Sequence, residues 1–129
     1  MDRADMDPIR RLAAAVLASA FDDLEDAQRK LRLIQSMQWN HRQRITNAID
    51  AARYLITDRE FMLGPDLDLW GSVLEIEIKD IRNTYRARAD GVLEAIVREL
   101  VRVRDRLPPV TRDRITAVEW DARRLEVAA

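Results

Sequence analysis

The chain has 129 residues, with 22 basic and 23 acidic side chains, so its formal net charge is −1. Hydrophobic residues make up 47% and charged residues 35%, which is typical of a folded protein and excludes a disordered chain. The absence of cysteine excludes disulfides, thiol catalysis and thiolate zinc sites, and one histidine is too few for a histidine-rich metal site.

The length predicts one domain over residues 1–129, because a chain of this size can bury a single core. Three glycines and four prolines are too few for a sandwich or barrel that turns every ten residues. We therefore predict an all-α protein: a bundle of about five helices with a helix-turn-helix-like unit and a long helix in its C-terminal half.

The first predicted helix runs from Pro8 to Gln38, with Asp7 as its N-cap and proline in the first turn. A second helix is expected from Asn40, its cap, to Thr57, so that residues 8–57 form an N-terminal helical hairpin. Leucines seven residues apart on the first helix form a helix-pairing seam. These predicted oligomerisation residues are Leu17, Leu24 and Leu31.

The N-terminal segment also resembles a secretory signal. Arg10 and Arg11 precede an apolar run over residues 12–20 that ends in small residues. The apolar pattern continues beyond any cleavage point, which favours a helix of the folded protein. No apolar run approaches the roughly 20 residues of a membrane span, so we expect a cytoplasmic protein without a membrane partner.

A break is predicted between Asp58 and Asp66, where the periodic pattern lapses and Gly64 and Pro65 follow. Asp66 then caps a short helix from Leu67 to Leu74. Together with the start of the next helix, this segment forms a helix-turn-helix-like unit over residues 66–88. Residues 72–78 alternate as a strand would, and this strand is the alternative for that segment.

The long helix is predicted from Glu77 to Leu107, because its apolar positions recur every three or four residues without interruption. Gly91 lies within it and permits a bend. Pro108 and Pro109 end the helix, and Thr111 caps a last helix over residues 111–127. The seam of the long helix supplies the remaining predicted oligomerisation residues: Val92, Ile96, Leu100 and Val103.

The helix-turn-helix-like unit is the main candidate site. Its packing residues would be Trp70, Leu74, Ile76 and Ile81, with Gly71 where the two helices approach. The second helix would present a cationic face to double-stranded DNA, because arginine and lysine neutralise phosphates and arginine and asparagine read base edges. The predicted DNA-binding residues are Lys79, Arg82, Asn83, Arg86 and Arg88.

Charge both favours and opposes this interpretation. Residues 79–88 carry four basic and one acidic side chain, a local charge of +3, whereas residues 58–80 carry seven acids against two bases, a local charge of −5. Glu75 also stands where such a turn prefers glycine. The alternative is that the basic residues are the solvated face of a helical hairpin, since any amphipathic helix spaces its polar face in this way.

A possible second basic surface surrounds Arg42 and Arg44, near Trp39 and His41. Tryptophan among arginines can stack on a base, although a tryptophan at a helix junction is also typical of a core anchor. The 20 arginines against two lysines suit an interaction protein, or reflect the base composition of the source genome.

No catalytic or cofactor motif is present. The acidic cluster at residues 22–26 follows a helical pattern rather than a calcium loop, so we interpret it as a solvated face and predict no metal site. Phosphate loops, nucleophile elbows and paired histidine ligands are missing from the sequence. We therefore expect a protein that is not an enzyme and has no cofactor.

Residues 51–88 resemble small helical proteins of prophages and gene-transfer-agent clusters, including small terminase-like packaging proteins, and helix-turn-helix regulatory proteins. The resemblance rests on Tyr54 to Phe61, Leu69 to Ile76, and Ile81 with Arg82. It implies a non-enzymatic oligomer that binds DNA for packaging or regulation, with Lys79, Arg82, Asn83 and Arg86 facing DNA.

Two functions therefore remain open. The first is a DNA-binding protein of this phage type that self-associates as a homo-oligomer through its apolar seams. The second is a helical adaptor or oligomerisation module that binds another protein and no nucleic acid.

Overall fold

The structure, a computed structural model, describes residues 3–36 and 42–128, and the side chains of residues 8–36 and 42–125. Of the described residues, 94% are helical and none lies in a strand, which confirms the all-α prediction. The helices are α1 (Arg3–Ser36), α2 (Arg42–Leu63), α3 (Asp66–Leu74), α4 (Ile78–Val103), a 3₁₀ turn η1 (Arg104–Arg106) and α5 (Pro109–Ala128).

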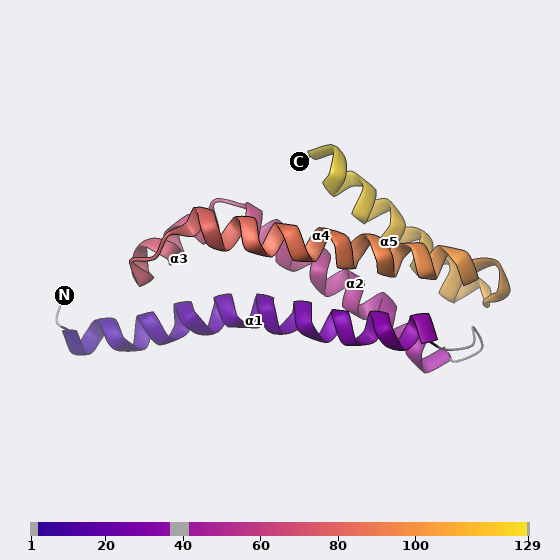
Figure 1. The fold of residues 1–129 in the computed structure, drawn as a ribbon, viewed down its shortest axis with the longest axis horizontal. Helices are drawn as coiled ribbons and strands as arrows, with labels where there is room; N and C mark the ends of the chain where they lie inside the picture. Colours follow the sequence, from indigo (N-terminus) through magenta and orange to yellow (C-terminus); the bar gives the residue numbers. More distant parts are fainter. Residues whose placement is uncertain (1–2, 37–41, 129) are drawn as a thin grey trace.

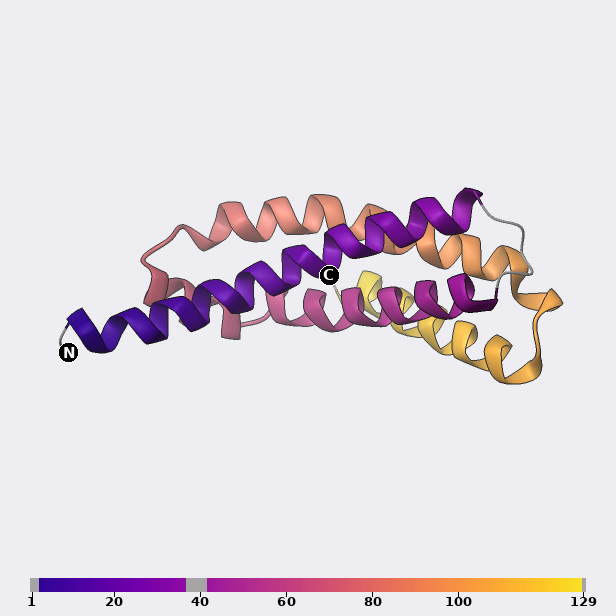
Figure 2. The ribbon, with the colours of Figure 1, turned by 90° about the horizontal axis from the view of Figure 1, so that it is seen from below.

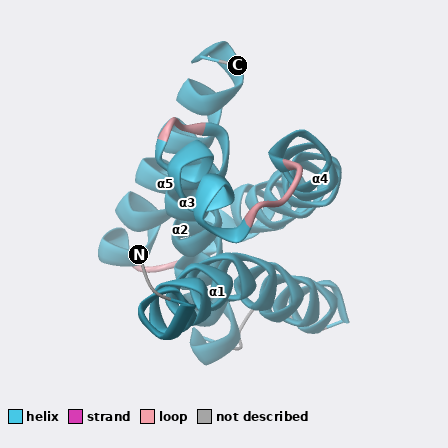
Figure 3. Cartoon of the chain, turned by 90° about the vertical axis from the view of Figure 1, so that its left-hand side faces the viewer, coloured by secondary structure: helices cyan, strands magenta, loops and turns pink. Residues whose placement is uncertain are grey.

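Helices α2 and α4 form the middle of an elongated bundle. Helix α1 packs against both of them from one side and α5 from the other, so α1 and α5 do not touch (Figures 1 and 3). Helices α1 and α4 run in the same direction, and α2 runs in the opposite direction (Figures 1 and 2). The short α3 lies against the N-terminal half of α1 and connects α2 to α4.

The apolar stripes of these helices meet in one core, and this corrects the predicted oligomerisation surface. Six of the seven residues predicted to join separate chains are buried, and Leu31 is half-buried against the same core. A seam with heptad spacing needs a partner helix, and the returning α2 is that partner within the chain. The buried six are Leu17, Leu24, Val92, Ile96, Leu100 and Val103.

The predicted ends of the N-terminal elements were wrong in three places. Helix α1 begins at Arg3, before Pro8. Helix α2 continues to Leu63 rather than ending at Thr57, and Asp66 is the first residue of α3 rather than a side-chain cap. The predicted cap Asn40 lies outside the described residues.

The apolar pattern did not predict the last turns of α2, because two charged residues, Asp58 and Arg59, occupy positions that face the bundle. Arg59 is buried, and Met62 one turn later is fully buried. Gly64 and Pro65 end the helix as predicted. A charged residue that faces the bundle interrupts the apolar pattern as a loop would, although its tertiary contacts keep the segment helical.

The C-terminal boundaries also differ from the prediction. Helix α4 is continuous past Gly91 and ends at Val103, where η1 tightens the last turn before Leu107. Leu107 is extended, as expected of a residue before proline. Helix α5 begins at Pro109, because proline suits the first helical position, so Thr111 is not its cap. No described helix is both long and apolar enough to cross a membrane.

The connection between α3 and α4 is a tight turn rather than the alternative strand. Glu75 has a φ of 57°, and the backbone N–H groups of Glu75 and Ile76 donate to the carbonyls of Ser72 and Gly71, each at 3.3 Å. This arrangement closes a helix with a left-handed residue, where glycine is usual. A Cβ atom at Gly71 would overlap the Ile78 side chain, so a residue without a side chain is needed where the helices approach.

Candidate interaction surfaces

Arg82, the central residue of the predicted DNA-binding face, is held inside the fold. Its Nε donates to the carbonyl of Met62 at 3.0 Å, and its Nη2 donates to the carbonyl of Gly64 at 3.1 Å and to Asp68 Oδ1 at 3.3 Å. A guanidinium at a helix C-terminus satisfies carbonyls that the helix leaves unpaired. The predicted outward orientation of Arg82 was therefore wrong, and the residue joins α2, α3 and α4.

The other predicted DNA-binding residues lie on the outer side of α4. Lys79, Asn83, Arg86 and Arg88 are exposed, and Arg88 Nη2 donates to Gln28 Oε1 of α1 at 3.3 Å. Three of the five predicted residues are thus exposed and have no side-chain hydrogen bond or ion pair among the described residues. They are Lys79, Asn83 and Arg86.

The residues predicted to pack the helix-turn-helix-like unit contribute unequally. Leu74 and Ile81 pack against the core and Trp70 is half-buried. Ile76 is 39% exposed, which contradicts its predicted packing role. It lies in the turn after Glu75, so its side chain leaves the α3–α4 contact.

The second predicted basic surface lies at the start of α2. Arg42 is exposed and Arg44 is half-buried. Trp39 and His41, which belong to the same hypothesis, lie outside the described residues. The structure therefore leaves this basic surface as two arginines in the first turn of α2.

Many arginines tie helices together. Arg114 of α5 pairs with Asp50 of α2 at 3.1 Å, and Arg104 pairs with Glu119 of α5 at 3.2 Å. Arginine suits this use because its planar fork reaches carboxylates and carbonyls in fixed geometry. The arginine-rich composition thus has a structural role that the count alone did not indicate.

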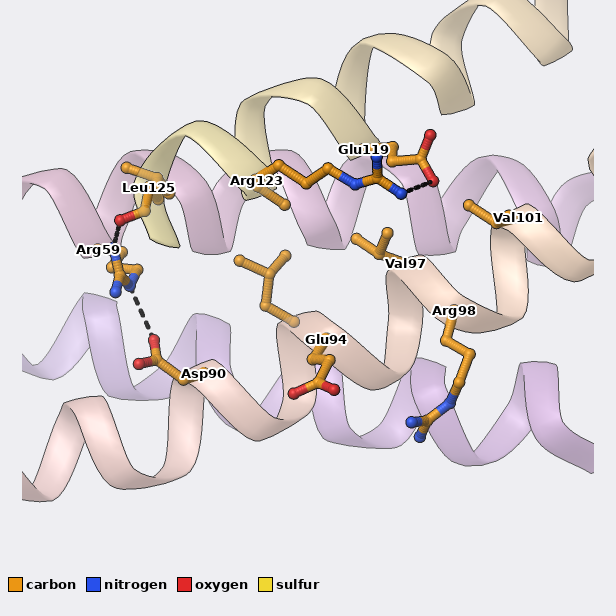
Figure 4. A pocket seen from close by; sticks show the side chains of 11 residues that line it. Arg59, Asp90, Glu94, Val97, Arg98, Val101, Glu119, Arg123 and Leu125 are labelled. Carbon is orange, nitrogen blue, oxygen red and sulfur yellow. Dashed lines mark hydrogen bonds and ion pairs between the residues drawn. The ribbon is translucent and has the colours of Figure 1, made fainter. Parts of the chain in front are cut away.

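A groove of about 500 Å³ lies between α4 and α5 (Figure 4). Aliphatic side chains line its walls, and charged side chains of both signs surround them. This arrangement is typical of a surface that receives an apolar ridge with a polar border. The aliphatic residues are Leu93, Val97 and Val101 of α4 with Ala122 and Leu125 of α5, and the charged residues are Asp90, Glu94, Arg98, Glu119 and Arg123.

Arg59 of α2 lies at one end of the groove, where only 7% of its side chain is exposed. Its Nε donates to Asp90 Oδ1 at 2.8 Å, and its Nη1 donates to the carbonyl of Leu125 at 3.4 Å (Figure 4). A buried charge needs such partners, and removing one typically costs about 3–5 kcal/mol. Arg59 therefore ties α4 and α5 to α2 beside the groove.

A polar cluster of the half-buried Asp23 and Asp58 and the fully buried Tyr85 lies where α1, α2 and α4 meet. Burial, a hydrogen bond with Asp23 and the charge of Asp23 together raise the pKa of Asp58 to about 8. Burial and the neighbouring carboxylates also raise the pKa of the Tyr85 hydroxyl. Tyr85 is fully buried, with its ring edge-on to Phe21 at a centroid distance of 5.6 Å.

Two atoms of this cluster, Asp58 Oδ2 and the Tyr85 hydroxyl, have no hydrogen-bond partner among the described residues. Asp23, Asp58 and Tyr85 do not line the α4–α5 groove. The raised pKa keeps the Asp58 carboxyl protonated near neutral pH, and the cluster presents no group to a ligand in that groove.

Sequence reasoning missed both the groove and the polar cluster. Asp23 was interpreted as part of a solvated acidic face, but it turns toward Asp58, whereas Asp26 on the same helix pairs at the surface with Arg29 and Lys30. Asp23 and Asp58 are half-buried because α1 packs on α2. The sequence signal was helical spacing, because each aspartate stands three residues after one core residue and four residues before another: Ala20 and Ala27 for Asp23, Leu55 and Met62 for Asp58.

No group of three or more histidine, cysteine or carboxylate side chains among the described residues could hold a metal ion. The chain matches no protein-family model, no curated protein and no solved structure.

Proposed function

We propose that this protein is a helical interaction module that binds an amphipathic helix of a protein partner in the α4–α5 groove. The observation that carries the proposal is the groove itself, a hollow of about 500 Å³ whose aliphatic walls include the half-buried Val97, Val101 and Ala122. An amphipathic helix places apolar side chains in such a groove at i, i+3, i+4 and i+7.

The border of the groove suits a partner with charges of both signs. Glu94 and Arg98 follow each other by one turn on α4, and Arg123 pairs with Glu119 on α5 at 3.2 Å. Because the border has nearly balanced charge, apolar contact supplies most of the affinity and the charges orient the partner helix. Salt should consequently change the affinity for the partner only weakly.

The proposal is tested with a photo-crosslinking residue at Val97, in the groove, and at Leu33, an exposed leucine on α1. The full chain is expressed in its source cells and cross-linked, and the captured protein is purified and titrated against the chain. We expect capture at position 97 but not 33, and purified binding that Val97→Glu weakens at least about tenfold while Leu33→Glu does not. Binding that both variants retain would refute the groove.

Duplex DNA binding is the second candidate, and one observation favours it. Lys79, Asn83 and Arg86 are exposed at spacings of four and three on the first turns of α4, which places them on one side of that helix. Arg82 no longer supports this candidate, because its donors are used within the fold.

Titration of a fluorescent duplex at low salt separates the two candidates. DNA binding through α4 predicts an affinity that falls steeply with salt and that Lys79→Glu with Arg86→Glu abolishes, because each cation that neutralises a phosphate releases counterions. Arg53→Glu, an exposed change on α2, is the matched control. No shift of any duplex at low salt would eliminate this candidate and leave the helix-binding groove.

A further inference from the structure

The outer face of α5 carries a stripe of exposed side chains. The positions follow one another by three or four residues, the spacing of one side of a helix. The side chains of Trp120 and Val110 are 72% and 73% exposed, which is unusually high for large apolar side chains. We call this surface the α5 stripe: Val110, Asp113, Ala117, Trp120 and Arg124.

The α5 stripe is complementary to itself when read in the opposite direction. In an antiparallel pair of α5 helices centred between Ala117 and Trp120, each Ala117 faces Trp120 of the second copy, so a small side chain meets a large one. Asp113 faces Arg124 of the second copy, so opposite charges meet. Each contact occurs twice, as a two-fold interface requires.

Parallel pairing does not have this complementarity. It would place Asp113 against Asp113 and Arg124 against Arg124, which repel, and would bring the two Trp120 rings together opposite no small residue. Arg124 already lies 3.4 Å from Asp121 on its own helix, but this contact is exposed and its carboxylate can be exchanged for another. The charge order along the stripe therefore selects the antiparallel orientation.

We propose that the α5 stripe binds the α5 stripe of a second copy of this chain, forming an antiparallel two-fold dimer. The stripe spans 15 residues, about 22 Å or four turns of helix. Such a contact is small compared with the interfaces of permanent dimers, so the dimer forms reversibly with concentration. No stripe residue lines the α4–α5 groove, and the dimer would present two grooves to its partners.

Sedimentation equilibrium of the full chain tests the dimer. We expect the average mass to rise with concentration from one chain toward two, and Trp120→Ala to raise the dissociation constant at least about tenfold. Leu33→Ala, another exposed apolar residue but on α1, is the matched control and should leave the constant unchanged. A single chain at every concentration would overturn the proposal without affecting the groove, whose test uses Val97.

A charge exchange tests the orientation. Asp113→Arg and Arg124→Asp should each weaken the dimer, because each places like charges opposite each other, whereas the double variant restores both pairs with reversed sign. Circular dichroism confirms that each variant folds. A double variant that is no stronger than the single ones would refute the antiparallel register.

The absence of cysteine allows a direct crosslink of the register. The variant with Asp113→Cys and Arg124→Cys should form disulfide-linked dimers on mild oxidation. Each single variant should not, since like positions lie about 16 Å apart along the antiparallel pair. Equal crosslinking by the single variants would indicate parallel pairing and contradict the proposal.

Discussion

Replacing Asp58 with asparagine should stabilise the protein at neutral pH. In the folded chain, burial and the neighbouring Asp23 raise the pKa of Asp58 from 3.8 to about 8. Between about pH 4 and pH 8 the folded state therefore binds one more proton at this site than the unfolded state does. The free energy of unfolding consequently falls as pH rises through this window.

The magnitude follows from the shift and the exposure of the site. One pKa unit corresponds to about 1.4 kcal/mol, so the full shift would correspond to roughly 6 kcal/mol. Asp58 is only partly buried, and solvent screening reduces this figure by half or more. We expect Asp58→Asn to raise the free energy of unfolding by about 1–3 kcal/mol near pH 7 and by almost nothing near pH 4.

Urea denaturation of both proteins at several pH values measures this difference. The effect of Asp58→Asn should grow steadily from pH 4 to pH 8, because the amide cannot ionise and keeps a donor for Asp23. Asp22→Asn, an exposed neighbour of Asp23, is the control and should show no such growth. A variant that is less stable than the wild type near pH 7, or a difference independent of pH, would refute the raised pKa of Asp58.

Three further predictions follow from the helix contacts, all read as changes in the free energy of unfolding. Arg82→Ala should cost about 2 kcal/mol, because the carbonyls of Met62 and Gly64 lose a charged donor; an unchanged stability would contradict this tie. Gly91→Ala should stabilise the protein by about 1 kcal/mol, since a Cβ there meets no atom within 4 Å. Gly71→Ala should instead destabilise it by roughly 1–3 kcal/mol, because the Cβ would overlap the Ile78 side chain. Equal effects of the two variants would contradict the packing of α3 on α4. Glu75→Gly should gain up to about 1 kcal/mol, because glycine relieves the left-handed backbone and the lost Arg10–Glu75 pair is exposed; a loss would mean that this pair matters more than the turn.

The helical class and the apolar faces could be predicted from the sequence because they depend on local spacing. The stripe of α4 has the three-and-four spacing of one helix face, and the segment is helical as predicted. Gly64 and Pro65 likewise end α2 through their own backbone preferences. These features need no knowledge of what each helix packs against.

The remaining errors concern features that depend on tertiary contacts. Spacing alone cannot show whether Leu24 and Ile96 meet a helix of the same chain or of another, and here they meet the same chain. The sequence pattern of a basic residue on a polar face is the same whether its side chain reaches solvent or the end of another helix, as Arg82 shows. The α4–α5 groove depends on how far two helices separate, which no local pattern determines.

The inward charges illustrate the same limit. Asp58 and Arg59 interrupt the apolar pattern of α2, and that interruption predicted a loop. The Asp58 side chain instead interacts with Asp23 of α1, and the Arg59 side chain pairs with Asp90 of α4. A charged residue in a helix interior is therefore compatible with burial when a partner helix supplies its counterpart.

In the proposed function, the chain receives a partner helix between α4 and α5. The most direct test of this function is isothermal titration of the purified partner into wild type, Val97→Glu and Leu33→Glu, with thermal melting of each chain alone. We expect matching melting temperatures and an affinity at least about tenfold weaker only for Val97→Glu. Equal affinities for all three proteins would contradict it.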